Sequence, residues 1–131
     1  MSQEFGADEA ASRNAGADAP LTKAEIEAQA AILRDALTGL PGITEKRMFG
    51  GLCFLLNGNM LCGSWKHGGM FRVGKEREAT AMAEPGVGAM TATGRRMTGL
   101  VQVDPAVLED DAARGQLLAL ALDFVGALPA K

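Results

Sequence analysis

Hydrophobic and polar positions follow two different rhythms along this chain. Between Ile26 and Leu37, the apolar residues Ile26, Ala30, Leu33 and Leu37 recur every three or four positions, which is the spacing of an amphipathic helix. Thr22 precedes this segment and Glu25 follows three positions later, a pair typical of a capping box. Gly39 is placed to end the helix. The pattern therefore predicts one helix with a single buried stripe.

Short apolar runs separated by turn residues replace the helical spacing after Arg47. Runs of this kind are typical of antiparallel hairpins. A short helix is predicted between Gly74 and Pro85, and a last helix is predicted to begin at Asp110. The predicted strands are Met48–Leu56, Met60–Lys66, Met70–Gly74, Val87–Thr91 and Met97–Val103.

This order of elements, α-β-β-β-α-β-β-α, has too few helical crossovers for a parallel sheet. We therefore expect a two-layer α+β fold, with helices on one face of an antiparallel five-stranded sheet. The 131 residues are enough for one core. We expect the domain to span residues 21–131. Residues 1–20 contain little apolar material besides alanine, which predicts a disordered tail.

The first twenty residues also lack the apolar centre of a signal peptide, and no run of the chain is long enough to cross a bilayer. We therefore expect a cytoplasmic protein without membrane contacts. In that compartment cysteines are normally reduced.

Charge is distributed unevenly, although the net charge is only −3. Residues 1–20 hold four acidic residues against one basic residue, whereas residues 46–96 hold eight basic residues against three acidic ones. A basic middle permits an anionic partner such as nucleic acid. Charged side chains on the solvent side of a sheet give the same pattern, so both interpretations stay open.

The two cysteines, Cys53 and Cys62, flank the pair Asn57-Gly58. A two-residue type I′ turn at that pair would place the cysteines directly opposite each other, with Cα atoms about 4.5 Å apart. A disulfide is then geometrically allowed, but buried cysteines also pack as small apolar residues. A longer loop with a bulge would pair Cys53 with Leu61 instead. A zinc site is disfavoured because the two thiolates and His67 make only three ligands.

No constellation typical of catalysis is visible. His67 lies in a predicted turn, and Ser64 near it has no third member of a triad. We expect a protein without enzymatic activity, cofactor or metal, with an enzyme using Ser64 and His67 as an alternative. Gly50-Gly51 within a predicted strand indicates a β-bulge, or else a contact with a ligand or a second subunit.

The run Arg47-Met48-Phe49-Gly50-Gly51, with the later Phe71-Arg72-Val73 and Gly94-Arg95-Arg96-Met97-Thr98-Gly99, resembles the N-terminal domain of the TfoX/Sxy competence-regulator family. The resemblance implies a fold like that of type III secretion chaperones, frequent dimerisation and no established catalytic residues. Founding members regulate natural competence and act with the cyclic-AMP receptor protein at certain promoters. Small stand-alone members lack the second, helical domain of the full regulators, and we expect this chain to be one of them.

We therefore expect a small regulatory or adaptor domain, linked to competence or transcription, that contacts a protein and more weakly DNA. The alternative is a redox-responsive protein that uses Cys53 and Cys62. Edge strands and the fold analogy predict a homodimer. The residues expected to contact an anion or a partner are Arg47, Arg72, Arg95 and Arg96.

Overall fold

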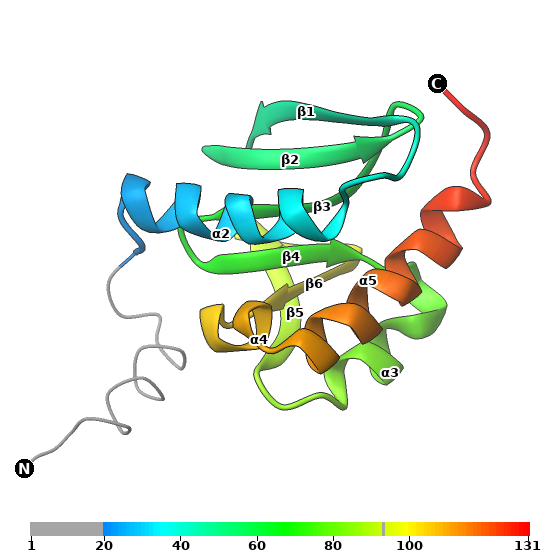
Figure 1. Cartoon of the computed structure of the whole chain (residues 1–131). Helices are drawn as coiled ribbons and strands as arrows, with labels where there is room; N and C mark the ends of the chain where they lie inside the picture. Colours follow the sequence, from blue (N-terminus) through cyan, green and yellow to red (C-terminus); the bar gives the residue numbers. More distant parts are fainter. Residues whose placement is uncertain (1–19, 93) are drawn as a thin grey trace, which may run out of the picture.

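Six antiparallel strands form one sheet in this computed structural model, which describes residues 20–92 and 94–131 (Figure 1). The strand order across the sheet is β1-β2-β3-β4-β6-β5. The strands are β1 (Ile43–Met48), β2 (Gly51–Leu56), β3 (Asn59–Trp65), β4 (Gly68–Arg72), β5 (Val87–Ala92) and β6 (Arg95–Val103).

Helices lie on one face of this sheet (Figure 1). They are α2 (Lys23–Ala36), α3 (Glu78–Met82), α4 (Pro105–Glu109) and α5 (Asp111–Gly126), and a short 3₁₀ helix η1 (Lys75–Arg77) leads into α3. The fold is therefore α+β with an open antiparallel sheet, as the sequence predicts.

The helix starts predicted from the sequence are confirmed. The Thr22 hydroxyl accepts a hydrogen bond from the Glu25 amide at 3.1 Å, and the Glu25 carboxylate accepts one from the Thr22 amide at 2.8 Å, which completes the capping box. Asp110 caps α5 by accepting a hydrogen bond from the Ala113 amide at 3.0 Å. These caps satisfy amides that have no partner within the helix.

The prediction of five strands is wrong, because the first predicted strand is preceded by another. Phe49 and Gly50 both have positive φ, 57° and 74°, and make a two-residue turn between β1 and β2. The Gly50-Gly51 pair is therefore not a bulge within a strand. Gly51 instead allows a close backbone approach, since a Cβ there would collide with the Ser64 carbonyl oxygen of β3.

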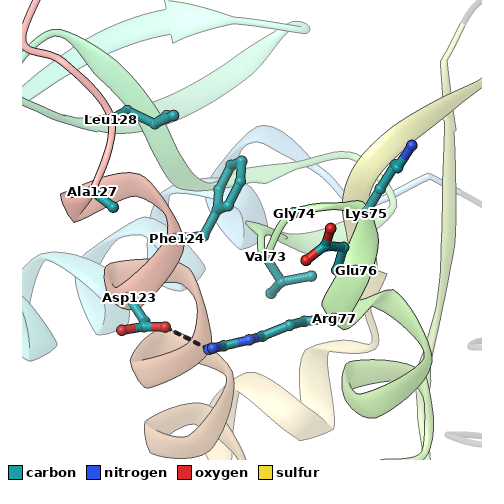
Figure 2. A pocket seen from close by; sticks show the side chains of 9 residues that line it. All are labelled: Val73, Gly74, Lys75, Glu76, Arg77, Asp123, Phe124, Ala127 and Leu128. Atoms are coloured by element: carbon teal, nitrogen blue, oxygen red, sulfur yellow. Dashed lines mark ion pairs between the residues drawn. The ribbon is translucent and has the colours of Figure 1, made fainter.

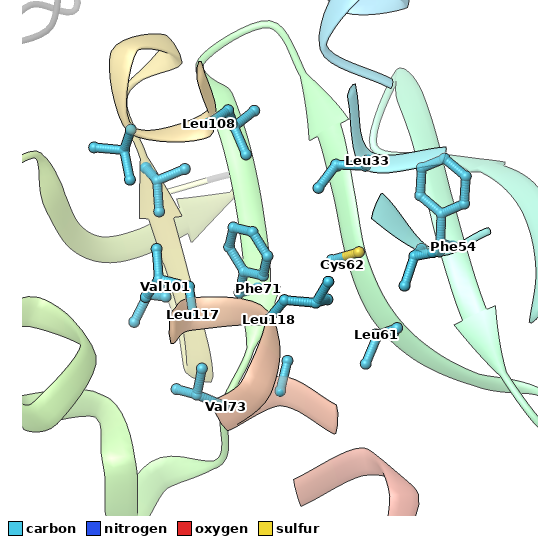
Figure 3. Close-up of a cluster of buried hydrophobic side chains, with 14 of the residues drawn as sticks. Leu33, Phe54, Leu61, Cys62, Phe71, Val73, Val101, Leu108, Leu117 and Leu118 are labelled. Atoms are coloured by element: carbon cyan, nitrogen blue, oxygen red, sulfur yellow. The ribbon is translucent and has the colours of Figure 1, made fainter. Parts of the chain in front are cut away.

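Two separate apolar clusters lie on the two sides of the sheet. The larger one, which we name the helix-side core, joins all four helices to the strands (Figure 3). Its large, fully buried side chains include Leu33, Phe54, Leu61, Phe71, Val101, Leu108 and Leu117.

The second cluster, which we name the methionine cluster, contains no helix residue. All six strands contribute to it, and none of the helices within residues 20–92 and 94–131 belongs to it. Its buried members are Cys53, Trp65, Met70, Met90 and Leu100, and its partly buried members are Met48, Phe49, Met60, Ala92 and Met97.

The disordered tail predicted for residues 1–20 lies outside the described residues, except for Pro20. None of the helices within residues 20–92 and 94–131 is sufficiently long and apolar to span a membrane.

Candidate functional site

The two cysteines do not form the predicted cross-strand pair. The turn at Asn57 and Gly58 is the expected one, with φ values of 52° and 88°. However, a register shift follows, so that Cys62 pairs with Phe54 and Cys53 pairs with Gly63. The extra residue in β3 is Leu61, which has no partner in β2.

This shift places the thiols in different surroundings. Cys53 lies in the methionine cluster and Cys62 lies in the helix-side core, and both are free thiols with no exposed surface. Burial raises the pKa of the Cys53 thiol to about 11. Burial, followed by the charge of Cys53, also raises the pKa of Cys62. Since the thiolate is the reactive form, two protonated and buried thiols are poor redox groups.

Ser64 and His67 are not paired in the described part of the chain. The Ser64 hydroxyl donates a hydrogen bond to the Ile26 carbonyl at 2.7 Å and accepts one from the Gln29 amide at 2.9 Å, so it is held by α2. The His67 ring instead makes an edge contact with Trp65, with centroids 4.9 Å apart. Burial and then the neighbouring Lys66 lower the pKa of His67.

The four candidate arginines do not form one patch. Arg47 lies on β1 at one edge of the sheet, whereas Arg95 and Arg96 begin β6 beside the opposite edge strand. Arg72 lies on β4, and its guanidinium is 5.6 Å from the centre of the Phe124 ring of α5. A single small anion therefore cannot contact all four.

Two of these arginines are ion-paired with helices. Arg47 Nη2 lies 3.4 Å from Glu27 Oε2 of α2, and both side chains are exposed. Arg96 Nη2 lies 2.5 Å from Oε1 of Glu78, whose side chain is only 10% exposed. The other oxygen of that carboxylate accepts a hydrogen bond from the Gly99 amide. Glu78 thus connects α3 to β6.

A pocket of about 570 Å³ lies between η1 and the end of α5 (Figure 2). This volume is within the usual range for ligand sites, about 300–1,000 Å³. Its apolar lining comes from Val73, Phe124, Ala127 and Leu128, and its charged lining from Lys75, Glu76, Arg77 and Asp123.

Gly74 determines the shape of this pocket. Its φ of 86° is unusual for any residue with a side chain, and a Cβ there would lie 2.5 Å from the Phe124 ring. The amide of Gly74 donates a hydrogen bond to the Gly99 carbonyl at 3.1 Å, which fixes the loop against β6. The strand end and the Phe124 ring can therefore approach closely and form one wall.

The charged lining is balanced. Arg77 Nη1 lies 2.6 Å from Asp123 Oδ2, and this ion pair joins η1 to α5 across the pocket (Figure 2). Lys75 and Glu76 add one charge of each sign. A site with apolar walls and no net charge selects its occupant mainly by shape and apolar contact.

The sequence did not point to this pocket. Phe124 and Leu128 have the spacing of a buried helix face, and both are in fact only partly buried. The one available signal was Gly74 between a strand and a helix, because glycine at such a junction often has positive φ.

Two regions thus have features of a binding site: the pocket beside α5, and the strands β1, β4 and β6 that carry the four candidate arginines.

The family model of the TfoX N-terminal domain matches residues 35–125, which is more than half of the chain. The chain belongs to the TfoX N-terminal domain family.

The TfoX N-terminal domain match covers all six strands and most of α5. It includes the Arg47–Gly51 run and the four candidate arginines. No curated protein and no solved structure matches the chain.

Among the described residues, no group of three or more histidine, cysteine, aspartate or glutamate side chains is arranged to hold a metal ion.

Proposed function

We propose that this TfoX-like domain is a non-enzymatic regulatory or adaptor module that binds a protein partner through the pocket between η1 and α5. The single observation that supports this function is the pocket itself, with an aromatic and aliphatic wall and a charged rim. A partner would insert an apolar side chain against Phe124 and Leu128. The rim would hydrogen-bond to the backbone of the inserted segment.

The charges of the pocket favour a protein partner over DNA. Duplex DNA is bound mainly through several cations that face its phosphates. In the pocket, Arg77 is already paired with Asp123 and Lys75 is offset by Glu76. We therefore propose that the regulatory role implied by the family resemblance is carried by protein contacts.

A pocket-filling variant tests this proposal. Ala127 is exposed at the pocket directly after α5, and Ala119 is exposed on α5 outside the pocket lining, so Ala127→Phe and Ala119→Phe make a matched pair. Tagged wild-type and variant proteins are used to capture partners from the source lysate, and the captured proteins are quantified by mass spectrometry. We expect at least one protein to be lost with Ala127→Phe and kept with Ala119→Phe.

The result against the proposal is a set of captured proteins that Ala127→Phe leaves unchanged. A labelled duplex of arbitrary sequence provides the second arm of the experiment. Affinity that decreases steeply with salt and is lost with Arg95→Glu would show that phosphate contacts carry the function.

We also propose that the domain forms a homodimer through the outer edge of β5. This strand carries no charged residue, whereas the opposite edge strand β1 carries three in a row. Uncharged edges are the ones that pair with another chain. Light scattering at high concentration should give a dimer mass, and Ala89→Lys on β5 should return the mass to that of a monomer. A monomer mass for the wild-type protein would contradict this.

A further inference from the structure

The side of the sheet opposite the helices α2 to α5, which we name the helix-free side with reference to the described residues alone, concentrates the most adaptable apolar side chains of this protein. Five of the seven methionines belong to the methionine cluster. Three of them, Met48, Met60 and Met97, are only partly buried, as is Phe49. Methionine is flexible and polarisable, and it adapts to differently shaped partners. This side therefore presents accessible apolar groups around a buried centre.

The charges on the strands differ between the two sides of the sheet. Glu45 is the single acidic residue of the six strands, and it pairs with Arg34 of α2 at 2.7 Å, on the helix side. The hydrogen bond from Arg34 lowers the pKa of Glu45. No strand therefore contributes a carboxylate to the helix-free side.

Two exposed cations do lie on that side. Lys46 pairs across the strands with Cys53, and Arg95 pairs with Ala92. Cross-strand partners share a face of the sheet, and both Cys53 and Ala92 belong to the methionine cluster. Lys46 and Arg95 thus stand on the two flanks of that cluster. Neither forms an ion pair within residues 20–92 and 94–131.

We propose that the helix-free side of the sheet is a second docking surface, which takes a polypeptide segment rich in both acidic and apolar residues. The apolar side chains of the segment would contact Met48, Met60 and Met97, and its carboxylates would face Lys46 and Arg95. This surface is separate from the pocket beside α5, so it goes beyond the function proposed above.

The two cations of the helix-free side argue against a second copy of this chain as the occupant. In a two-fold interface each patch meets its own copy, so Lys46 and Arg95 would face the same cations of the partner. Like charges brought together across an interface repel each other and oppose binding. An acidic segment removes that repulsion.

The burial of the tryptophan ring argues against a nucleic acid as the occupant. Single-stranded nucleic acids bind by stacking bases on exposed aromatic rings. Trp65, the only tryptophan, is 4% exposed, and Phe49 packs against it with ring centroids 6.2 Å apart. Partly exposed methionine side chains suit a polypeptide better than a stacked base.

A peptide selection tests this surface without knowledge of the natural partner. Tryptophan-free random peptides of about 12 residues are displayed and selected on the full chain. We expect the enriched peptides to combine aspartate or glutamate with leucine, methionine or phenylalanine. Their binding is then followed by the fluorescence of Trp65, which lies in the methionine cluster.

Adjacent residues on one strand supply the matched control. Lys46 and Arg47 point to opposite sides of the sheet, because Arg47 is paired with Glu27 of α2. We expect Lys46→Glu combined with Arg95→Glu to weaken binding of the enriched peptides roughly tenfold or more. We expect Arg47→Glu to change it by less than about twofold. Circular dichroism checks that all variants remain folded.

Four results of the peptide experiment would overturn the proposal. They are a selection that yields no binding peptide, enriched peptides without an excess of acidic residues, equal loss with Arg47→Glu, and loss of peptide binding with Ala127→Phe. The last result would assign the peptides to the pocket and would support the proposed function instead. A dimer that Lys46→Glu dissociates would assign this surface to a second copy, and duplex binding that Lys46→Glu abolishes would assign it to DNA.

Discussion

The two sides of the sheet differ in what neutralises their charges. On the helix side, Arg47 and Arg96 meet carboxylates of α2 and α3, and Glu45 meets an arginine of α2. On the helix-free side, Lys46 and Arg95 have no such partner among the described residues. Charged residues that are adjacent in sequence thus have different roles, because neighbouring strand residues face opposite sides.

This difference separates charges that support the fold from charges that are available to a partner. Ion pairs between strands and helices position the helices, although exposed pairs contribute only about 0–1 kcal/mol each. Lys46 and Arg95 form no ion pair with a described helix, so their charges are available to an acidic segment of a partner. The pocket beside α5 resembles the helix side in this respect, because its cation Arg77 is also ion-paired, with Asp123.

The largest expected effect comes from truncating the helix-side core. Phe71 is fully buried there, whereas Met48 is only partly buried in the methionine cluster. We expect Phe71→Ala to lower the free energy of unfolding by roughly 3–5 kcal/mol, because it leaves a cavity. We expect Met48→Ala to lower it by roughly 1 kcal/mol, since less area is lost. Urea unfolding followed by circular dichroism measures both, and equal losses would remove the distinction between the two sides.

A smaller effect is expected at the buried carboxylate that joins α3 to β6. Glu78→Gln weakens the hydrogen bonds to Arg96 and to the Gly99 amide. We expect it to lower the free energy of unfolding by about 2 kcal/mol. The matched change Glu45→Gln weakens the exposed ion pair with Arg34. It should lower the free energy of unfolding by less than about 1 kcal/mol. Thermal unfolding of both variants makes the comparison. If Glu45→Gln proves the more damaging, the assignment of Glu78 as the connecting residue is wrong.

At neutral pH no change is expected from the titration of the two thiols, whose effect on stability develops only at alkaline pH. Folding raises the pKa of both, so each contributes its full stability below the ordinary thiol pKa of about 8.5. That contribution is lost as the pH rises toward the folded value, which is about 11 for Cys53. The chain has no tyrosine to titrate in the same range. We therefore expect the free energy of unfolding to decrease from pH 8.5 upward.

Replacing each cysteine with alanine compares the two sides. The pKa of Cys62 is raised further than that of Cys53, so Cys62→Ala should flatten the alkaline part of the stability curve more than Cys53→Ala does. A double variant with the same alkaline slope as the wild-type protein would show that the thiols do not contribute.

Local chemistry explains what the sequence could predict. The capping box of Thr22 and Glu25, the Asp110 cap and the Asn57-Gly58 turn each depend on a few neighbouring residues. The strand β1 was missed because its centre, Thr44–Arg47, is polar and exposed at an edge of the sheet. An edge strand of this kind has no alternation of apolar and polar residues to detect.

The remaining features depend on contacts between distant segments. The shift that separates Cys53 from Cys62 arises at Leu61, which has no partner in β2 and is buried in the helix-side core. The pairing of Arg96 with Glu78 requires α3 to lie against β6. Sequence alone shows that both residues are charged, but the side of the sheet that Arg96 faces depends on strand register.

The most direct test of the difference between the two sides is a nuclear magnetic resonance titration with methionine methyl groups labelled with carbon-13. Met48, Met60 and Met97 belong to the methionine cluster, whereas Met82 packs against the helix-side core. On addition of an enriched acidic peptide, the signals of the first three should shift and that of Met82 should stay in place. A shift of Met82 without the others, or no shift at all, would contradict the assignment of the helix-free side as a docking surface.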